Sequence, residues 1–226
     1  MDRKSELAAA WDRNAENWTR AVRDGLIASR KAGSDEAIVS AIVARRPARL
    51  LDVGCGEGWL IRRVCALTGC EAVGIDGAAS LIERASEADP RNRYFVLSYD
   101  ALIAGAPDLG GTFDIVAFNY ALFDQESAKL LAAVRPLMAA AGRVVIQSLH
   151  PCCLPPGEPY RDGWRTEDFA GFEGQDWQPM PWYFRTLESW HRVVRDAGLV
   201  LHELREPLDE ATGRPLSLLM VCGAEA

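Results

Sequence analysis

Short apolar runs alternate with amphipathic stretches over the middle of the chain. The runs are rich in Leu, Val, Ile and Phe and predict buried strands at 49–53, 71–75, 93–97, 114–118 and 143–149. The segments between them have the apolar spacing of helices and predict helices at 58–68, 78–88 and 126–140, with Gly142 placed to end the last one. Such alternation predicts a doubly wound α/β fold with a mostly parallel sheet.

The first part of the chain predicts two helices in front of this sheet. Residues 2–24 read as a polar helix, in which Trp11 and Trp18 are seven residues apart and so lie on one face. A second helix is expected from about 34 to 46, where Pro47 ends it. We expect residues 1–46 to form a helical cap.

The last part of the chain first breaks the pattern and then resumes it. Residues 151–185 are rich in Pro, Gly and aromatic side chains, and long irregular connections that keep aromatics are usually functional. We therefore expect a substrate lid at 151–185, with packing of the rings on the sheet an equally good interpretation. A helix capped by Thr186 and strands at 199–205 and 216–222 complete a single domain over 1–226.

The first strand runs into closely spaced glycines at Gly54, Gly56 and Gly58. Glycine tolerates positive φ and has no Cβ, so this loop is suited to holding a small polar ligand at the N-terminus of the next helix. A dinucleotide fingerprint needs a small residue where the chain has Trp59, and no Lys-Ser/Thr pair follows Gly58 as in a phosphate-binding P-loop. Nicotinamide cofactors and nucleoside triphosphates are both disfavoured.

The spacing Asp52-x-Gly54-x-Gly56-x-Gly58 resembles motif I of the class I S-adenosylmethionine-dependent methyltransferases. This resemblance covers about residues 45–149 and implies a seven-stranded Rossmann-like sheet with an antiparallel C-terminal strand. It implies S-adenosylmethionine as cofactor, with Asp52 orienting the glycine loop or receiving the methionine ammonium. Trp11 and Trp18 resemble the N-terminal helix that folds over the cofactor in many relatives.

Two further acids follow strands at the same expected edge of the sheet. Asp76, followed by Gly77, closes the second strand and can accept hydrogen bonds from both ribose hydroxyls. Asp100 stands where the family usually has an acid that binds the adenine amino group. The remaining expected cofactor contacts lie beside these ends: Tyr99, Ala101 and Asn119.

The acceptor side of the site is less defined. Enzymes that methylate the amino groups of nucleobases or glutamine typically have Asn-Pro-Pro-aromatic after the fourth strand, and Tyr120 and Ala121 stand at the proline positions here. His150 closes the fifth strand and can take a proton near neutral pH, although a structural histidine is the commoner interpretation. Tyr183 lies in a segment similar to small-molecule methyltransferases, and these two residues are the candidate general bases.

Composition limits the partners. The net charge of −7 gives no basic surface for nucleic acid, so we expect a small-molecule substrate. No apolar run is long enough for a membrane span or a signal-peptide core, so we expect a cytoplasmic protein. The six cysteines contain no Cys-x-x-Cys pair, so neither a metal site nor a disulfide framework is expected, and the sequence leaves the oligomeric state open.

Two alternatives to a methyltransferase stay open at this point. A binding protein that holds S-adenosylmethionine or S-adenosylhomocysteine without transferring methyl needs the same glycine loop. An NAD-binding oxidoreductase is disfavoured by Trp59 but shares the strand-loop-helix arrangement.

Overall fold

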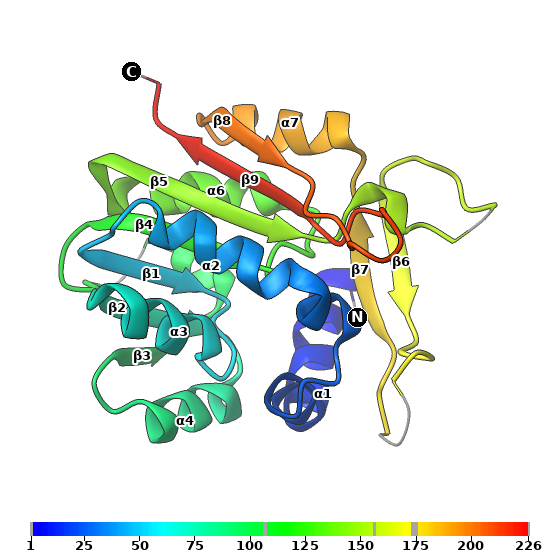
Figure 1. The fold of residues 1–226 in the computed structure, drawn as a ribbon, viewed down its shortest axis with the longest axis horizontal. Helices are drawn as coiled ribbons and strands as arrows, with labels where there is room; N and C mark the ends of the chain where they lie inside the picture. The colour runs from blue at the N-terminus through cyan, green and yellow to red at the C-terminus, as the bar shows by residue number, and fades with distance from the viewer. Residues whose placement is uncertain (1, 106–107, 156, 173–175, 226) are drawn as a thin grey trace.

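The computed structural model describes residues 2–105, 108–155, 157–172 and 176–225. Its main sheet consists of β1 (Arg49–Val53), β2 (Glu71–Asp76), β3 (Arg93–Val96), β4 (Phe113–Asn119), β5 (Met138–Ser148), β8 (Val200–Arg205) and β9 (Leu218–Gly223). The strand order is β3-β2-β1-β4-β5-β9-β8 (Figure 1). β9 is antiparallel to β5 and β8, and the pairings among β1 to β5 are parallel. The predicted fold class is confirmed.

Helices cover both faces of the sheet. They are α1 (Arg3–Arg23), α2 (Asp35–Val43), α3 (Trp59–Thr68), α4 (Ala79–Ala88), α5 (Tyr99–Ala104), α6 (Ser127–Val134) and α7 (Leu187–Asp196), with a π-helical turn at Arg30–Ser34. α2, α3 and α4 contribute to the core on one face, and α5, α6 and α7 to the core on the other. Side chains along β1 point alternately to the two faces, because a strand is pleated. Leu50 accordingly belongs to the first core, and Leu51 and Val53 belong to the second.

Side-chain caps fix where several helices begin. Asp2 accepts a hydrogen bond from the Ser5 N–H at 2.9 Å at the start of α1. Thr186 does the same for the Ser189 N–H at 3.1 Å, which confirms it as the cap of α7. Each cap satisfies an N–H group that has no partner within its own helix.

The predicted helix over 126–140 is wrong at its C-terminal end. α6 ends at Val134, and a single 3₁₀ turn at Arg135–Leu137 leads directly into β5. Pro136 ends the helix because its nitrogen has no hydrogen to donate and its ring clashes with the preceding turn. Gly142 therefore lies inside β5 instead of capping a helix, and the alanines before it form strand despite their helix propensity.

The segment predicted as an irregular lid contains a hairpin. β6 (Gly163–Glu167) and β7 (Met180–Phe184) pair antiparallel and form a second, separate sheet. Figure 1 shows this hairpin beside α1, beyond the C-terminal ends of β1 and β5, and α1 contacts β7. The cap and the expected lid thus meet over the edge of the sheet where ligands bind in open α/β folds. Among the described residues, no helix has the length and apolarity needed to cross a bilayer.

Candidate functional site

The glycine loop leaves an open cradle at the end of β1. Gly54, Gly56 and Gly58 have φ values of +75°, +54° and +79°. The Gly54 N–H donates to the Ile75 carbonyl at 2.8 Å, which fastens the loop to β2. A Cβ on Gly54 would lie 2.5 Å from the Tyr99 hydroxyl oxygen, whereas a Cβ on Gly56 would meet nothing within 4 Å. The loop thus packs tightly on one side and exposes backbone on the other.

Asp76 connects the glycine loop to the loop after β2. Its Oδ2 accepts a hydrogen bond from the Gly56 N–H and its Oδ1 from the Ala78 N–H, both at 2.9 Å. Burial raises the pKa of this carboxyl group, and the two backbone hydrogen bonds oppose that rise. Each oxygen keeps a further lone pair, so the carboxylate can still accept from a pair of hydroxyl groups. Gly77 follows Asp76 directly, in the loop after β2, and is exposed.

Asp52 is a buried acid beside Asp76. Its exposed fraction is 1%, and its Oδ1 has no hydrogen-bond partner among the described residues. Burial, and next the charge of Asp76, raise the pKa of Asp52 to about 8. No arginine or lysine in the described part of the chain forms an ion pair with either acid. A cationic ligand group at this place would relieve the cost of both charges.

A third acid near this site comes from the cap. Asp12 on α1 raises the pKa of Asp76 through its charge, so α1 brings a carboxylate toward the ends of β1 and β2. Nothing in the sequence marks Asp12, because its position between Trp11 and Trp18 on a polar helix gives no sign of the sheet edge near it. None of these three acids forms an ion pair with a basic residue in the described part of the chain, so a cationic ligand group is favoured at this place.

The residues after β3 separate into a buried and an exposed group. The Tyr99 side chain lies against the glycine loop, and its hydroxyl donates to the Ala121 carbonyl at 3.1 Å. Burial, and then the charge of Asp76, raise the pKa of this phenol. Asp100 and Ala101 are exposed, and Asp100 forms an ion pair with Lys4 of α1. The structure therefore brings Tyr99, but not Asp100, to the acids of the loop.

Two residues at the end of β4 are unusual, Asn119 for its buried polar atom and Tyr120 for its backbone conformation. The Asn119 Oδ1 is buried without a partner in the described part of the chain, and Tyr120 has a φ of +51°, a conformation that non-glycine residues rarely adopt. The Tyr120 hydroxyl forms no hydrogen bond with the described residues. Burial raises the pKa of this phenol, and the nearby polar side chains of Ser34, Ser217 and Gln147 act in the opposite direction. This polar group has no signature in the sequence, because its members come from four separate segments.

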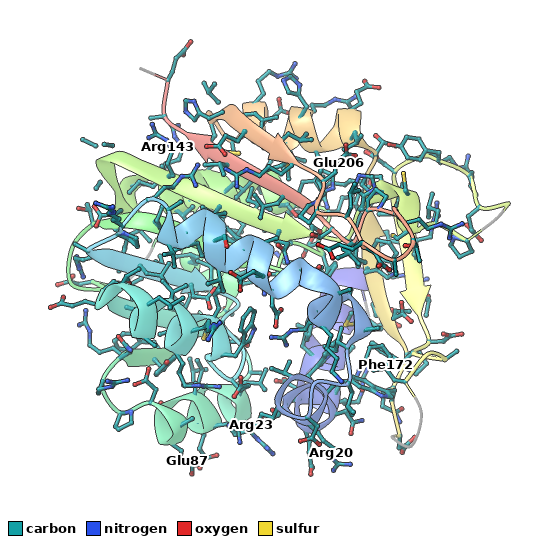
Figure 2. All side chains as sticks on the ribbon, in the orientation of Figure 1. Arg20, Arg23, Glu87, Arg143, Phe172 and Glu206 are labelled. Atoms are coloured by element: carbon teal, nitrogen blue, oxygen red, sulfur yellow. The ribbon has the colours of Figure 1, made fainter. Side chains whose placement is uncertain are left out.

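Aromatic side chains join the cap to the lid. The Trp11 ring stacks on Phe123 with 6.1 Å between centroids, and Trp18 meets the edge of Trp177 at 5.0 Å. Phe172, labelled in Figure 2 between α1 and the hairpin, lies 6.0 Å from Trp18. Trp11 and Trp18 thus share one apolar cluster with residues of the predicted lid.

The two candidate bases lie in different surroundings. His150 is 3% exposed, its Nδ1 accepts from the Cys152 N–H at 3.1 Å, and its Nε2 lies 2.7 Å from the Glu206 Oε1. This pattern places the proton on Nε2 and leaves no free ring nitrogen. The Tyr183 ring packs edge-on against Trp164 at 5.5 Å, within the hairpin. A base role for His150 would require one of its hydrogen bonds to open.

Ion pairs around the buried side chain of Glu57 stabilise the glycine loop. Glu57 is 3% exposed, and Arg62 contacts its two carboxylate oxygens at 2.8 and 2.7 Å. Arg23 at the end of α1 reaches the same carboxylate at 3.1 Å. The Glu57–Arg62 spacing is local, but only the tertiary structure brings Arg23 to the loop. These ion pairs connect α1 to the glycine loop.

Comparisons with known proteins agree with this geometry. The family described as "Methyltransferase domain" matches residues 29–204. A malonyl-[acyl-carrier protein] O-methyltransferase of Enterobacter lignolyticus is 30% identical over 138 residues, which are 60% of this chain and 51% of that protein. The chain thus matches about half the length of this relative.

Solved structures with low sequence identity share the fold. An S-adenosylmethionine-dependent methyltransferase of Mesorhizobium loti has a TM-score of 0.64 and 21% identity, with 84% of this chain and 98% of that chain covered. The 1,6-didemethyltoxoflavin-N1-methyltransferase of Burkholderia thailandensis, solved with its acceptor and S-adenosylhomocysteine, has a TM-score of 0.63 and 18% identity, with 100% and 92% covered.

Proposed function

Because the chain belongs to the methyltransferase-domain family, we propose that it transfers the methyl group of S-adenosylmethionine to an oxygen, nitrogen or carbon atom of a small molecule. The observation that carries the proposal is the open glycine cradle beside two acids that lack basic partners in the described part of the chain. S-adenosylmethionine bears an ammonium and a sulfonium group, whereas the diphosphate of NAD would meet repulsion at the same place. The charge of the site therefore favours the cationic S-adenosylmethionine over the anionic diphosphate of NAD.

The residues divide the binding task. In this proposal Asp52 receives the ammonium group or orients the glycine loop, and the backbone of Gly54, Gly56 and Gly58 lines the methionine tail. Asp76 accepts hydrogen bonds from the ribose hydroxyls. Gly77, Tyr99 and Asn119 would line the rest of this proposed site, and Trp11 and Trp18 would close it from the cap. Asp100 and Ala101 are exposed, and an adenine contact by Asp100 would require its ion pair with Lys4 to open. The bound cofactor supplies an activated methyl group on a positively charged sulfur atom.

The remaining work of the protein is to position the acceptor and exclude water. Transfer by in-line displacement depends on holding the nucleophile close to the methyl carbon and aligned with it, which can supply several kcal/mol. The aromatic cluster of cap and lid excludes water from this space. His150 and Tyr183 remain the two candidate bases, for acceptors whose nucleophile must lose a proton.

Two further properties belong to the same proposal. A small-molecule acceptor is supported by the net charge of −7, which disfavours nucleic acid, and by the acceptor named for the Burkholderia thailandensis structure. A cytoplasmic location stays a prediction from the sequence.

Calorimetry on the full chain tests the cofactor assignment. We expect S-adenosylhomocysteine and S-adenosylmethionine to bind and NAD to give no signal; tight NAD binding without the other two would overturn the proposal. A panel of small oxygen, nitrogen and carbon acceptors, assayed for S-adenosylhomocysteine formation, then tests catalysis. Binding without turnover over a wide panel would favour the non-catalytic alternative.

A further inference from the structure

A second group of reactive side chains lies at the opposite edge of the sheet. Cys65 in the last turns of α3 and Cys70 just before β2 have their sulfur atoms 3.0 Å apart, inside van der Waals contact. Cys65 is half-buried, Cys70 is buried, and both are free thiols. The pair is separate from the glycine loop, which lies at the other end of α3.

The pKa values of the two thiols are shifted in opposite directions. Either sulfur can donate in the hydrogen bond that joins them. With Cys65 as the donor, this hydrogen bond lowers the pKa of the Cys70 thiol to about 7, and the same bond, followed by burial, raises the pKa of Cys65. Such a division is typical of a dithiol with one nucleophilic and one resolving cysteine, because the thiolate is the reactive species. Once the sulfur of Cys70 is bonded to another group, the hydrogen bond that holds the proton on Cys65 is lost.

Both cysteines line a cavity of about 440 Å³ with a positive charge balance. Its charged lining consists of Arg49, Arg91 and Arg93 against Glu71. The buried Asp89 pairs with Arg91 at 3.7 Å, which leaves a balance of one positive charge in a chain whose net charge is −7. Two of the arginines are held in place by backbone carbonyls.

The Arg49 Nη1 donates to the Thr112 carbonyl at 2.7 Å, and the Arg93 Nη2 donates to the Leu109 carbonyl at 2.9 Å. The cavity therefore offers fixed positive charge beside a nucleophilic sulfur, an arrangement that concentrates small anions near it.

We propose that Cys65 and Cys70 are a redox-active dithiol that anionic low-molecular-weight disulfides oxidise at this arginine-lined cavity. The Cys70 thiolate attacks one sulfur of the disulfide RSSR, forms a mixed disulfide and releases RS⁻. Cys65 then loses its proton to solvent, and its thiolate attacks the Cys70 sulfur and releases the second RS⁻. Protonation of the released thiolates gives two RSH, so the cysteine pair is oxidised by two electrons and RSSR is reduced by two.

The resulting bond would be readily reversible. It closes only the short loop 65–70, so it restricts the unfolded chain little and gains little loop-closure entropy. A bond that small thiols can reach from the cavity has a less negative reduction potential than a structural disulfide.

Peptide mapping of the full-length protein tests the proposal directly. Cleavage after arginine gives peptide 64–84, which holds Cys65 and Cys70 and no other cysteine, and peptide 144–161, which holds the exposed Cys152 and Cys153 as an internal reference. With glutathione disulfide, which is anionic, we expect peptide 64–84 to lose two hydrogen atoms and to resist alkylation. Its rate relative to the reference should be about tenfold higher than with uncharged hydroxyethyl disulfide at low salt. High salt should remove most of this preference.

Two sets of variants sharpen the test. Cys65→Ser should leave a stable mixed disulfide on Cys70, and Cys70→Ser should leave peptide 64–84 without an internal bond. Arg91→Gln should slow oxidation by glutathione disulfide several-fold without changing the rate with hydroxyethyl disulfide. A pair that stays reduced while the reference peptide reacts, or equal relative rates with both disulfides, would overturn the proposal. None of these readouts depends on the methyltransferase assignment.

Discussion

Replacing Asp52 by asparagine should change how stability depends on pH. Asp52 is 1% exposed, and burial together with Asp76 raises its pKa to about 8 in the folded protein, against about 3.9 in an unfolded chain. Between these two values the folded state holds a proton that the unfolded state has released. Rising pH therefore favours unfolding, and stability falls until the pH passes the folded pKa. The amide group that replaces the carboxyl group in the variant has no such proton.

The size of the effect follows from the two pKa values. One bound proton gives a slope of about 1.4 kcal/mol per pH unit, so the Asp52 contribution falls by about 3 kcal/mol between about pH 5 and pH 7. The full shift of about four units corresponds to about 6 kcal/mol above pH 8, an order-of-magnitude upper value. A loss of 2 to 3 kcal/mol is a large fraction of the stability of an ordinary domain, roughly 5 to 15 kcal/mol.

Urea unfolding of the ligand-free protein and of Asp52→Asn, at about pH 5 and pH 7, measures this contribution. The loss of stability between the two pH values should be about 3 kcal/mol larger in the original chain, because the other titrating groups are present in both proteins and largely cancel in the difference. Parallel pH profiles for the two proteins would refute the reasoning, since they would mean that Asp52 is ionised in the folded state at pH 5.

The other predictions concern the glycine loop and its supports. Asp76→Ala should weaken S-adenosylhomocysteine binding by about 1.5 to 3 kcal/mol in calorimetry, through loss of charge-assisted hydrogen bonds, and unchanged affinity would remove Asp76 from the site. Gly54→Ala should abolish S-adenosylhomocysteine binding, because its Cβ would lie 2.5 Å from the Tyr99 hydroxyl oxygen. Gly69 has a similar φ of +73° with open space around it, so Gly69→Ala should keep binding and cost only about 1 kcal/mol of stability by thermal unfolding. An equal loss of binding in both variants would contradict a steric cause. Arg62→Ala should lower the free energy of unfolding by about 2 kcal/mol because it leaves the buried acid at 57 with one partner, while exposed Arg63→Ala serves as the matched control and should change it by less than about 0.5 kcal/mol.

Local sequence predicted the elements wherever one signal dominated. The strand at 49–53 and the start of α7 at Thr186 appear at their predicted places, because apolar runs and side-chain caps act over a few residues. The predicted helix over 126–140 ran too far because the alanines at 139–141 favour helix, whereas Pro136 and pairing of β5 with β4 and β9 decide the outcome. The β6–β7 hairpin was missed because it pairs in a sheet of its own and packs on α1.

The site divides in the same way. The sequence by itself determined the glycine loop and the acids at 52 and 76, because positive φ and strand-end carboxylates are properties of single positions and of the strand before them. Only the tertiary structure brought Asp12 and Arg23 from α1 to that loop and paired Asp100 with Lys4. It alone gathered the polar group under Tyr120 and set the two thiols of the α3–β2 connection in contact. The reason is physical: desolvation, charge and packing depend on every neighbour in space, and those neighbours are distant along the chain.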